Sequence, residues 1–188
     1  MSKVSMICVA YRRPVQIKVT IASMLAQTFQ DWELLVIHDG PEGAEEIRSV
    51  CDLFADSRIR FENTEVRYND FGHSLRELGL SKVTGEFVGH TNDDNYYAPV
   101  YLERMVAGLE SGFDFVYCNM LHSYGGWTPV DTVPRWGQID GGGWLARKSI
   151  LPVQWKDKSM NGDGHYVEQI IEAGVKVIKI SGILFIHN

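Results

Sequence analysis

The chain has 188 residues, 45% of them hydrophobic and 11% aromatic, which is typical of a globular protein with one core. A formal net charge of −6 argues against a general nucleic-acid-binding surface and against an anionic-membrane surface. Its cysteines, Cys8, Cys51 and Cys118, are too widely spaced for a disulfide framework or a zinc site. No apolar run is long enough for a transmembrane segment, and residues 1–5 do not resemble a signal peptide. We therefore expect a soluble, cytoplasmic protein, and peripheral attachment to a membrane stays compatible with these features.

The first half of the chain alternates between predicted strands and helices. Apolar residues 4–10 predict a buried strand, and Pro14 suits the first turn of a helix that ends near residue 27. The elements predicted next are a strand at 32–38, a helix at 43–55, a strand at 58–62, a helix at 72–82 and a strand that begins at residue 86. This alternation predicts an α/β protein of three layers, Rossmann-like, with a mostly parallel central sheet.

The pattern changes in the second half. A helix is predicted from about Pro99 and a strand at 113–119, but residues 123–143 are rich in Gly, Pro, Trp and Asp and predict a long loop. Loops of that length inside a compact domain are usually functional, so we expect this one to face a substrate. The elements predicted after it are a strand at 143–146, a helix at 163–173 and two short strands at 175–180 and 183–186.

Acidic residues follow the predicted strands at several points. Asp39 follows the strand at 32–38, and the pair Asp93-Asp94 ends the strand that begins at residue 86. Open α/β proteins bind ligands at the carboxyl edge of the sheet, and carboxylate oxygens suit Mg²⁺ or Mn²⁺ bound together with phosphates. Asp163, just before a predicted helix, has the chemistry of a general base. The structural alternatives are turn formation at Asp39 and at the acidic pair, and helix capping by Asp163.

Among the histidines, His187 follows a predicted strand and is a candidate metal ligand, with simple solvent exposure as the alternative. No spacing among the remaining histidines indicates a metal site. The chain also lacks the G-x-G-x-x-G and G-x-x-x-x-G-K-[ST] motifs, which argues against dinucleotide oxidoreductases and P-loop enzymes.

Several segments match family patterns in a fixed order along the chain. They are residues 10–14 (pattern T-Y-N-R-P), 23–34 (S-x-L-x-Q-T-Y-x-x-W-E-L), 36–41 (V-V-D-D-G-S), 69–88 (N-x-G…A-R-N-x-G…A-x-G-E-Y-I) and 91–94 (D-x-D-D). Through these segments the chain resembles glycosyltransferase family 2, whose members are inverting nucleotide-sugar enzymes of the GT-A fold. Asp39 aligns with the second aspartate of D-D-G-S, and Arg76 aligns with the arginine of the family's A-R-N segment.

The resemblance implies roles for the matching positions. The nucleotide and the donor sugar would be bound by Ala10, Tyr11, Arg13, Asp39, Arg76, Asn92, Asp93 and Asp94. A Mn²⁺ or Mg²⁺ ion would be held by Asp93, Asp94 and His187 and would neutralise charge on the departing nucleoside diphosphate. Asp163 would be the catalytic base that deprotonates the acceptor hydroxyl. The resemblance also implies one GT-A domain over residues 1–188, with a nucleotide-binding half at about 1–97 and an acceptor-binding half at about 98–188.

An acceptor site is expected in the Gly-rich second half. Aromatic faces stack on the C–H surfaces of sugars, so Trp127, Trp136 and Trp144 are candidate acceptor residues. Residues 140–144 resemble the family stretch that borders the donor sugar and the acceptor, which implies an acceptor role for Asp140 as well. Glycines at 141–143 would allow the backbone to approach a ligand closely. Packing in the core is the alternative for these tryptophans.

We therefore predict a metal-dependent, inverting glycosyltransferase of the hexosyltransferase type. It would move a single sugar from a nucleoside-diphosphate sugar, with UDP the favoured nucleotide, to a glycan, lipid or protein hydroxyl. Thr91 replaces the first aspartate of D-x-D, so metal binding would rest on fewer carboxylates. His38 replaces the first aspartate of D-D-G-S, which leaves Asp39 alone there. The Gln-x-x-Arg-Trp mark of processive members is absent, which favours single transfer. The alternatives are a non-catalytic nucleotide- or sugar-binding module and a nucleotidyltransferase of related fold, which would carry a Gly-rich, Lys-containing phosphate loop.

Overall fold

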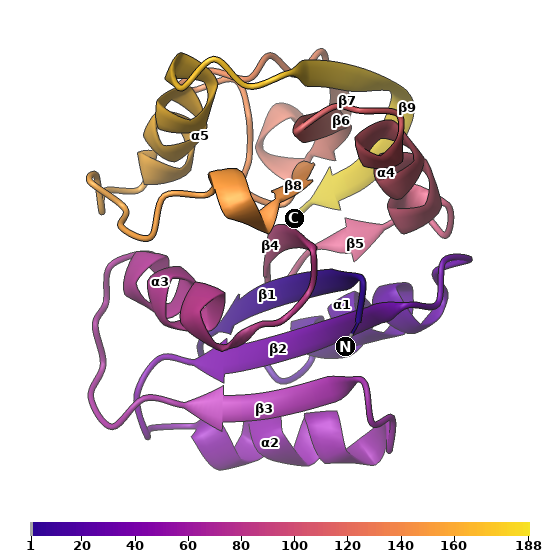
Figure 1. Cartoon of the computed structure of the whole chain (residues 1–188). Helices are drawn as coiled ribbons and strands as arrows, with labels where there is room; N and C mark the ends of the chain where they lie inside the picture. The colour runs from indigo at the N-terminus through magenta and orange to yellow at the C-terminus, as the bar shows by residue number, and fades with distance from the viewer. Residues whose placement is uncertain (1) are drawn as a thin grey trace.

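The computed structural model describes residues 2–188, and Figure 1 shows its helices and strands. The first half contains, in chain order, β1 (Val4–Ala10), α1 (Gln16–Leu25), β2 (Trp32–His38), α2 (Ala44–Leu53), β3 (Ile59–Asn63), α3 (His73–Lys82) and β4 (Phe87–Asn92). The second half contains β5 (Tyr96–Tyr97), α4 (Tyr101–Glu110), β6 (Phe115–His122), β7 (Thr128–Val130), β8 (Trp144–Arg147), α5 (Gly162–Glu172) and β9 (Val177–His187). Short 3-10 turns lie at Ser123–Gly125 and Lys148–Ile150. The strands and helices predicted for the first half are all present.

The second half differs from prediction in three places. The loop predicted at 123–143 contains β7, which pairs antiparallel with β6 and is too short to carry a periodic signal. The two predicted closing strands are one strand, β9, with Ser181 and Gly182 bulging from its pairing with β6. Gly182 has a φ of 98°, which glycine adopts without strain and which broke the pattern in the sequence. The two-residue β5, which was not predicted, pairs with β9.

The described strands form one sheet in the order β3-β2-β1-β4-β8-β6-β9-β5, with β7 attached to β6. Strands β3, β2, β1 and β4 are parallel to one another. The short β8 is antiparallel to both β4 and β6, so β6 and its partner β9 again run in the direction of β1. The longer pairings are therefore parallel, and the predicted α/β class with a mostly parallel sheet is confirmed.

Alternating side chains of β1 explain why helices cover both faces of the sheet. Met6 and Cys8 belong to a core shared with α1, α2 and α4, whereas Ile7 and Val9 belong to a core shared with α3 and α5. Successive side chains of a strand point to opposite faces, so a strand that is apolar throughout needs cover on each side. Gly79 lets α3 approach β1 closely, because a Cβ there would lie 2.5 Å from the Cγ2 of Ile7. The result is the three-layer arrangement visible in Figure 1.

The parallel strands end in register, and this brings the residues that follow them together. Ala10 at the end of β1 pairs with His38 at the end of β2, and β4 is in register on the other side of β1. In the second half, β6 and β9 end with His122 opposite His187 at the same edge. Because β8 runs the other way, residues 140–143 just before it reach this edge too. The carboxyl edge of the sheet thus collects side chains from distant parts of the sequence.

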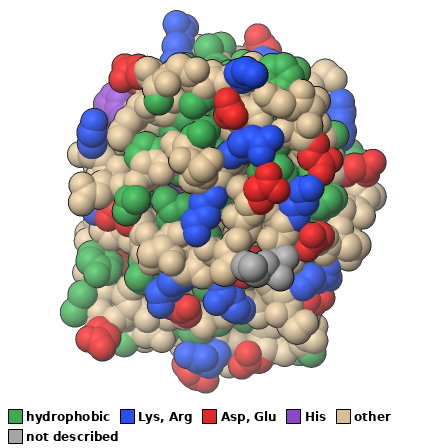
Figure 2. Space-filling model, in the orientation of Figure 1, with side chains coloured by type: hydrophobic (Ala, Val, Ile, Leu, Met, Phe, Trp, Pro, Cys, Tyr) green, Lys and Arg blue, Asp and Glu red, His purple; other side chains and the backbone are tan. Residues whose placement is uncertain are grey.

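The face of the molecule seen in Figure 2 carries basic and acidic side chains intermingled over its surface. Within residues 2–188, no helix combines the length and the hydropathy that crossing a bilayer would require.

Candidate active site

A cleft of about 660 Å³ opens at the carboxyl edge of the sheet. Its walls come from the residues that follow β1, β2, β4 and β9, from the loop before α3, and from the start of α5. The predicted nucleotide and donor residues all line it: Ala10, Tyr11, Arg13, Asp39, Arg76, Asn92, Asp93 and Asp94. Asp140, Asp163 and His187 line the same cleft. The fold therefore brings together residues as far apart in the sequence as Ala10 and His187.

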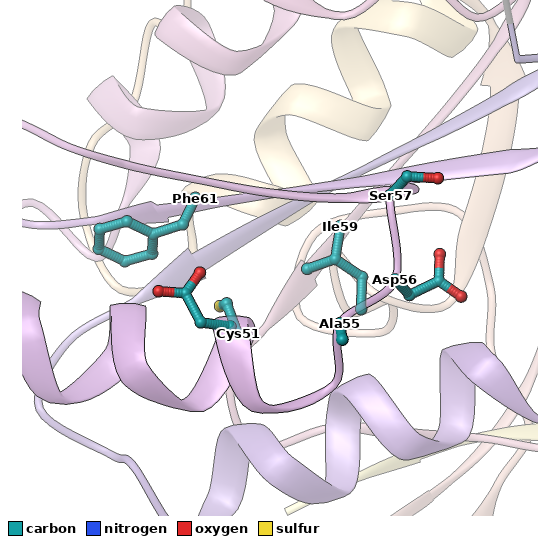
Figure 3. Close-up of a pocket in the computed structure, with 7 residues that line it drawn as sticks. Cys51, Ala55, Asp56, Ser57, Ile59 and Phe61 are labelled. Atoms are coloured by element: carbon teal, nitrogen blue, oxygen red, sulfur yellow. The ribbon is translucent and has the colours of Figure 1, made fainter.

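A smaller hollow, of about 350 Å³, lies between the end of α2 and β3 (Figure 3). Burial raises the pKa of its Cys51 thiol to about 12, so the thiol stays protonated. The carboxylate of Asp56 is paired with Arg58 at 2.7 Å. With its thiol inert and this carboxylate engaged, the hollow is a poorer candidate than the cleft for chemistry.

One end of the cleft is built from Tyr11, Asp39 and Arg67. The two carboxylate oxygens of Asp39 accept the backbone N–H groups of Tyr68 and Asn69, at 2.8 and 2.9 Å, and so fix the loop that follows β3. The guanidinium of Arg67 lies 3.9 Å from the centre of the Tyr11 ring and 4.0 Å from Asp39. A ring, a carboxylate and a planar cation at one end of a cleft suit a flat, polar ligand such as a nucleobase.

The acidic pair at the end of β4 is already in contact with a cation. Asp93 accepts the Tyr11 N–H at 2.9 Å and pairs with Arg13 at 3.2 Å, and Asp94 pairs with the same Arg13 nitrogen. Burial raises the pKa of Asp93 to about 6, although Tyr11 and Arg13 oppose the rise. Burial likewise raises the pKa of Asp94, against the charges of Arg13 and His187. Buried carboxylates of this kind gain from a nearby positive charge.

Two side-chain atoms in the cleft that have no hydrogen-bond partner suit a divalent metal, which would complete its coordination with phosphate oxygens. Asp94 Oδ1 and His187 Nδ1 are both buried and have no hydrogen-bond partner among residues 2–188. Carboxylate oxygen and imidazole nitrogen both ligate divalent ions such as Mn²⁺. The described residues contain no group of three or more His, Cys, Asp or Glu side chains arranged to hold a metal. A metal at this site would therefore take further ligands from water and from phosphate oxygens, as Mg²⁺ commonly does.

Asp163 stands at the first turn of α5 and is held by backbone groups. Its Oδ2 accepts the N–H of Gly141 at 3.0 Å, and its Oδ1 accepts the N–H of Gly164 at 2.9 Å. Burial raises the pKa of Asp163 to about 6, and the negative charge of Asp140 adds to this rise. A carboxylate with a pKa near neutrality, fixed in a cleft, can accept a proton during a reaction.

Asp140 and His187 form an ion pair in the cleft, with His187 Nε2 and Asp140 Oδ2 3.1 Å apart. Burial alone would raise the pKa of Asp140, but the hydrogen bond and charge of His187 outweigh it and keep that pKa low. Burial would lower the pKa of His187, and Asp140 reverses this and raises it. Asp140 thus fixes the His187 ring and leaves its other nitrogen free to bind a ligand.

Arg76, a buried residue of α3, lines the cleft and also contacts residues of the core. Its Nη1 donates to the Phe71 carbonyl at 2.8 Å, and its Nη2 donates to Asn92 Oδ1 at 2.6 Å. Its guanidinium also lies 5.3 Å from the ring centre of the buried Trp155. Arg76 therefore places a fixed positive charge beside the strand end that carries Asp93.

The tryptophans expected to bind an acceptor do not share one position. Trp144 is fully buried, with ring centres of His90 and Phe115 at 4.9 and 5.3 Å, so its ring has no face open to a sugar and the acceptor role expected of it is wrong. Its place on β8, beside β6 and β4, makes it a core residue. Trp127 and Trp136 are about half exposed, at 53% and 49%, and lie outside the lining of the cleft.

Several cleft residues could not be found from the sequence. Arg67, Phe71 and Met160 line the cleft, and each lies in a segment without regular periodicity. Tyr124 lines it too, but it belongs to the loop at 123–143 that was expected to face a substrate. Phe71 is 59% exposed and has a φ of 58°, an unusual backbone conformation for an aromatic residue. Such strain is found preferentially at ligand-binding sites, but it is invisible before the fold is known.

Known proteins resemble this chain in sequence over most of its length. The family model described as glycosyl transferase family 2 matches residues 5–166. The UDP-Glc:alpha-D-GlcNAc-diphosphoundecaprenol beta-1,3-glucosyltransferase WfgD of Escherichia coli is 30% identical over 62% of this chain and 45% of its own. The GalNAc(5)-diNAcBac-PP-undecaprenol beta-1,3-glucosyltransferase of Campylobacter jejuni is 27% identical over 64% of this chain and 39% of its own. The chain thus spans less than half the length of these relatives.

Two solved structures share the fold. Residues 1–349 of S. aureus TarS in complex with UDP-GlcNAc superpose with a TM-score of 0.80 at 16% identity, covering 98% of this chain and 58% of that one. The mannosyltransferase PcManGT from Pyrobaculum calidifontis, in complex with GDP-Man and Mn²⁺, superposes with a TM-score of 0.77 at 15% identity, covering 99% and 56%. At this identity the likeness shows a GT-A type of fold, as predicted.

Proposed function

Since the chain belongs to glycosyltransferase family 2, we propose that it transfers a single sugar from a nucleoside-diphosphate sugar to a hydroxyl acceptor, with inversion at the anomeric carbon. The observation that carries this proposal is that Asp163 and the pair Asp93-Asp94 line one cleft. Direct displacement needs two kinds of group, one set that binds the departing diphosphate and a base that takes the proton of the incoming hydroxyl.

The nucleoside would bind at the end of the cleft formed by Tyr11, Asp39 and Arg67. Asp39 is buried and fixed by two backbone N–H groups, so it is pre-organised to accept hydrogen bonds from a base or ribose. UDP is the favoured nucleotide because the names of one relative and one structural neighbour specify UDP-sugars. The neighbour that holds GDP-Man makes GDP the first competitor.

The candidate ligands of a divalent metal, Mn²⁺ or Mg²⁺, are Asp93, Asp94 and His187. Because these three side chains are not already arranged as a metal site among residues 2–188, the ion would bind them together with water and phosphate oxygens of the donor. When bound, such an ion neutralises charge that develops on the leaving diphosphate. The chain's own part is to fix the ligands: Asp140 orients His187, and the Tyr11 N–H orients Asp93. Arg76 adds a buried positive charge on the same side of the cleft.

Asp163 would be the base, because its two backbone hydrogen bonds aim the carboxylate and its raised pKa suits proton transfer near pH 6–7. The backbone of Trp136 packs against the same first turn of α5, since a Cβ on Gly164 would lie 2.7 Å from the Trp136 Cα. The exposed Trp136 ring, which stacks on the His165 ring with ring centres 5.8 Å apart, therefore stays a candidate for binding the part of an acceptor that extends beyond the cleft. The acceptor would be a glycan, lipid or protein hydroxyl.

Nucleotide binding is the first experiment. Isothermal titration of UDP, GDP and dTDP, each with Mn²⁺ and with EDTA, should show micromolar binding of one nucleotide that depends on the metal. That nucleotide then defines the sugar donors for a turnover assay that measures release of the diphosphate, and product NMR reports inversion. No binding by folded protein would contradict the proposal.

The Asp163→Asn variant separates an enzyme from a binding module. An enzyme should lose turnover by about 10²-fold or more while its affinity for the nucleotide stays within a factor of three, because Asp163 lies outside the nucleoside and metal ligands. A protein that binds nucleotide but shows no turnover in either form would be a non-catalytic module.

A further inference from the structure

We propose that Arg13 and the divalent metal exclude each other on the pair Asp93-Asp94, so that the metal binds well only when a nucleoside diphosphate draws Arg13 off the pair. This inference rests on the proposed function, because it concerns the same donor site. It assigns Arg13 a positioning role: its guanidinium holds the acidic pair when the site is empty and moves to the diphosphate when the donor arrives.

The contacts of Arg13 place one cation where a metal would bind. A single guanidinium nitrogen, Nη1, contacts Asp93 Oδ1 at 3.2 Å and also contacts Asp94 Oδ2. The second oxygen of Asp93 is occupied by the Tyr11 N–H at 2.9 Å. Of the four carboxylate oxygens, Asp94 Oδ1 is the one that has no partner among the described residues. A divalent ion that bound both carboxylates would have to take oxygens that Arg13 now contacts.

The exposure of these side chains decides which of them can move. The side chains of Asp93 and Asp94 are 4% and 13% exposed, whereas that of Arg13 is 51% exposed. The carboxylates follow directly from the buried strand β4, but Arg13 lies between β1 and α1 on a long side chain that reaches in from solvent. Arg13 can therefore leave the pair without any change in the core.

Charge explains why the exchange needs the donor. Two adjacent, buried carboxylates repel each other unless a cation lies between them, and a guanidinium and a divalent ion repel each other at the same oxygens. A metal that binds without a nucleotide gains contact with the two carboxylates but displaces the Arg13 guanidinium into water. A metal that arrives with a diphosphate offers Arg13 a new anion, and the planar guanidinium matches phosphate oxygens well. Metal and diphosphate should therefore strengthen each other's binding through Arg13.

The test measures Mn²⁺ binding without activity. Free Mn²⁺ is followed by electron paramagnetic resonance during titration of the wild type, R13Q and R12Q, with no nucleotide present. R13Q should bind Mn²⁺ about tenfold more tightly than the wild type, because it removes a full positive charge that lies within a few ångströms of the carboxylates. R12Q is the matched control: it removes the same charge one residue away, but Arg12 pairs with Glu42 at 2.8 Å and both are exposed. It should bind Mn²⁺ like the wild type.

A second titration adds saturating UDP or, if calorimetry selects it, GDP. The wild type should gain Mn²⁺ affinity by a larger factor than R13Q does, because R13Q has no guanidinium to transfer to the diphosphate. This difference in coupling is a readout that a merely structural role of Arg13 would not change.

Equal or weaker Mn²⁺ binding by R13Q in the nucleotide-free titration would overturn the inference, and so would an equal gain in R12Q. The neutral variant R13M replaces R13Q if circular dichroism shows that R13Q does not fold. Failure of nucleotide binding would instead contradict the proposed function, and the nucleotide-free titration would still decide whether Arg13 competes with the metal.

Discussion

The proposed role of Asp163 as the base predicts where the acid limb of the pH–rate profile should lie. A base must be ionised to accept a proton, so activity should be lost as the pH falls through the pKa of Asp163 and regained as it rises. Burial, together with the charge of Asp140, moves that pKa from its usual value of 3.8 to about 6. The acid limb should therefore lie about two pH units above the position expected for an exposed aspartate.

The size of the effect follows from the fraction of Asp163 that is ionised. With a pKa of about 6, roughly a tenth of the carboxylate is ionised at pH 5 and roughly nine tenths at pH 7, so kcat should fall about tenfold between them. An exposed aspartate would stay ionised over that whole range. The assay is release of nucleoside diphosphate at saturating donor and Mn²⁺, so that the acidic pair is bound to metal at each pH.

Asp140→Asn provides the mutational test. It removes the charge that assists burial in raising the pKa of Asp163. The amide oxygen can still accept a hydrogen bond from either His187 or the Gly142 N–H, which the two carboxylate oxygens now accept separately. The acid limb should move to lower pH. Asp131→Asn is the matched control, since it removes an exposed carboxylate that pairs with Lys179 and should leave the limb in place. A wild-type profile that is flat between pH 5 and 7, in protein shown to be folded, would refute the reasoning, and so would a limb that Asp140→Asn leaves unmoved.

Three further substitutions test the nucleoside end of the cleft and the core packing elsewhere in the chain. Trp155→Ala should lower the free energy of unfolding in urea by about 3–5 kcal/mol, because the buried ring lies between those of Tyr166 and His73, with ring centres 4.0 and 4.5 Å away. A loss below about 1 kcal/mol would contradict that packing. Asp39→Asn should lower the free energy of unfolding by about 1–3 kcal/mol and weaken nucleotide binding in calorimetry, because an amide can accept only one of the two backbone N–H groups that the carboxylate now accepts. Unchanged nucleotide affinity would argue against the role of Asp39 in the nucleoside site. His90→Leu should leave stability unchanged or raise it, because neither ring nitrogen of this buried side chain has a hydrogen-bond partner among residues 2–188; a thermal or urea midpoint well below that of the wild type would show a partner that this reasoning omits.

The sequence alone was enough for the elements of the first half and for the class of the fold. Continuous apolar runs such as residues 4–10 and 32–38 can be satisfied only by strands buried on both faces, and the helical patterns between them require parallel connections. The acidic residues that follow these runs could be placed at the carboxyl edge for the same reason. Local pattern is informative there because each strand is long and uniformly buried.

The second half was predicted less well because its structure depends on contacts between distant segments. A three-residue strand such as β7, or a strand interrupted at Gly182, has too little periodicity to be recognised without its partner β6. Trp144 illustrates the same limit. A tryptophan in a Gly-rich segment suits a sugar platform as well as a core, and only its pairing between β4 and β6 decides for the core.

Many of the residues that line the cleft could be listed from the sequence, but their relations to one another could not. Asp140 and His187 are 47 residues apart, and Arg13 and Asp93 are 80 apart. The ion pair between the first two and the bridge between the second two arise because β8 runs antiparallel while β1, β4 and β9 end together at one edge. Sequence determines which charges the chain carries and which strands they follow. The tertiary structure alone decides which charges face each other in a buried cleft, and hence which carboxylate is held by backbone N–H groups and which is held by a cation.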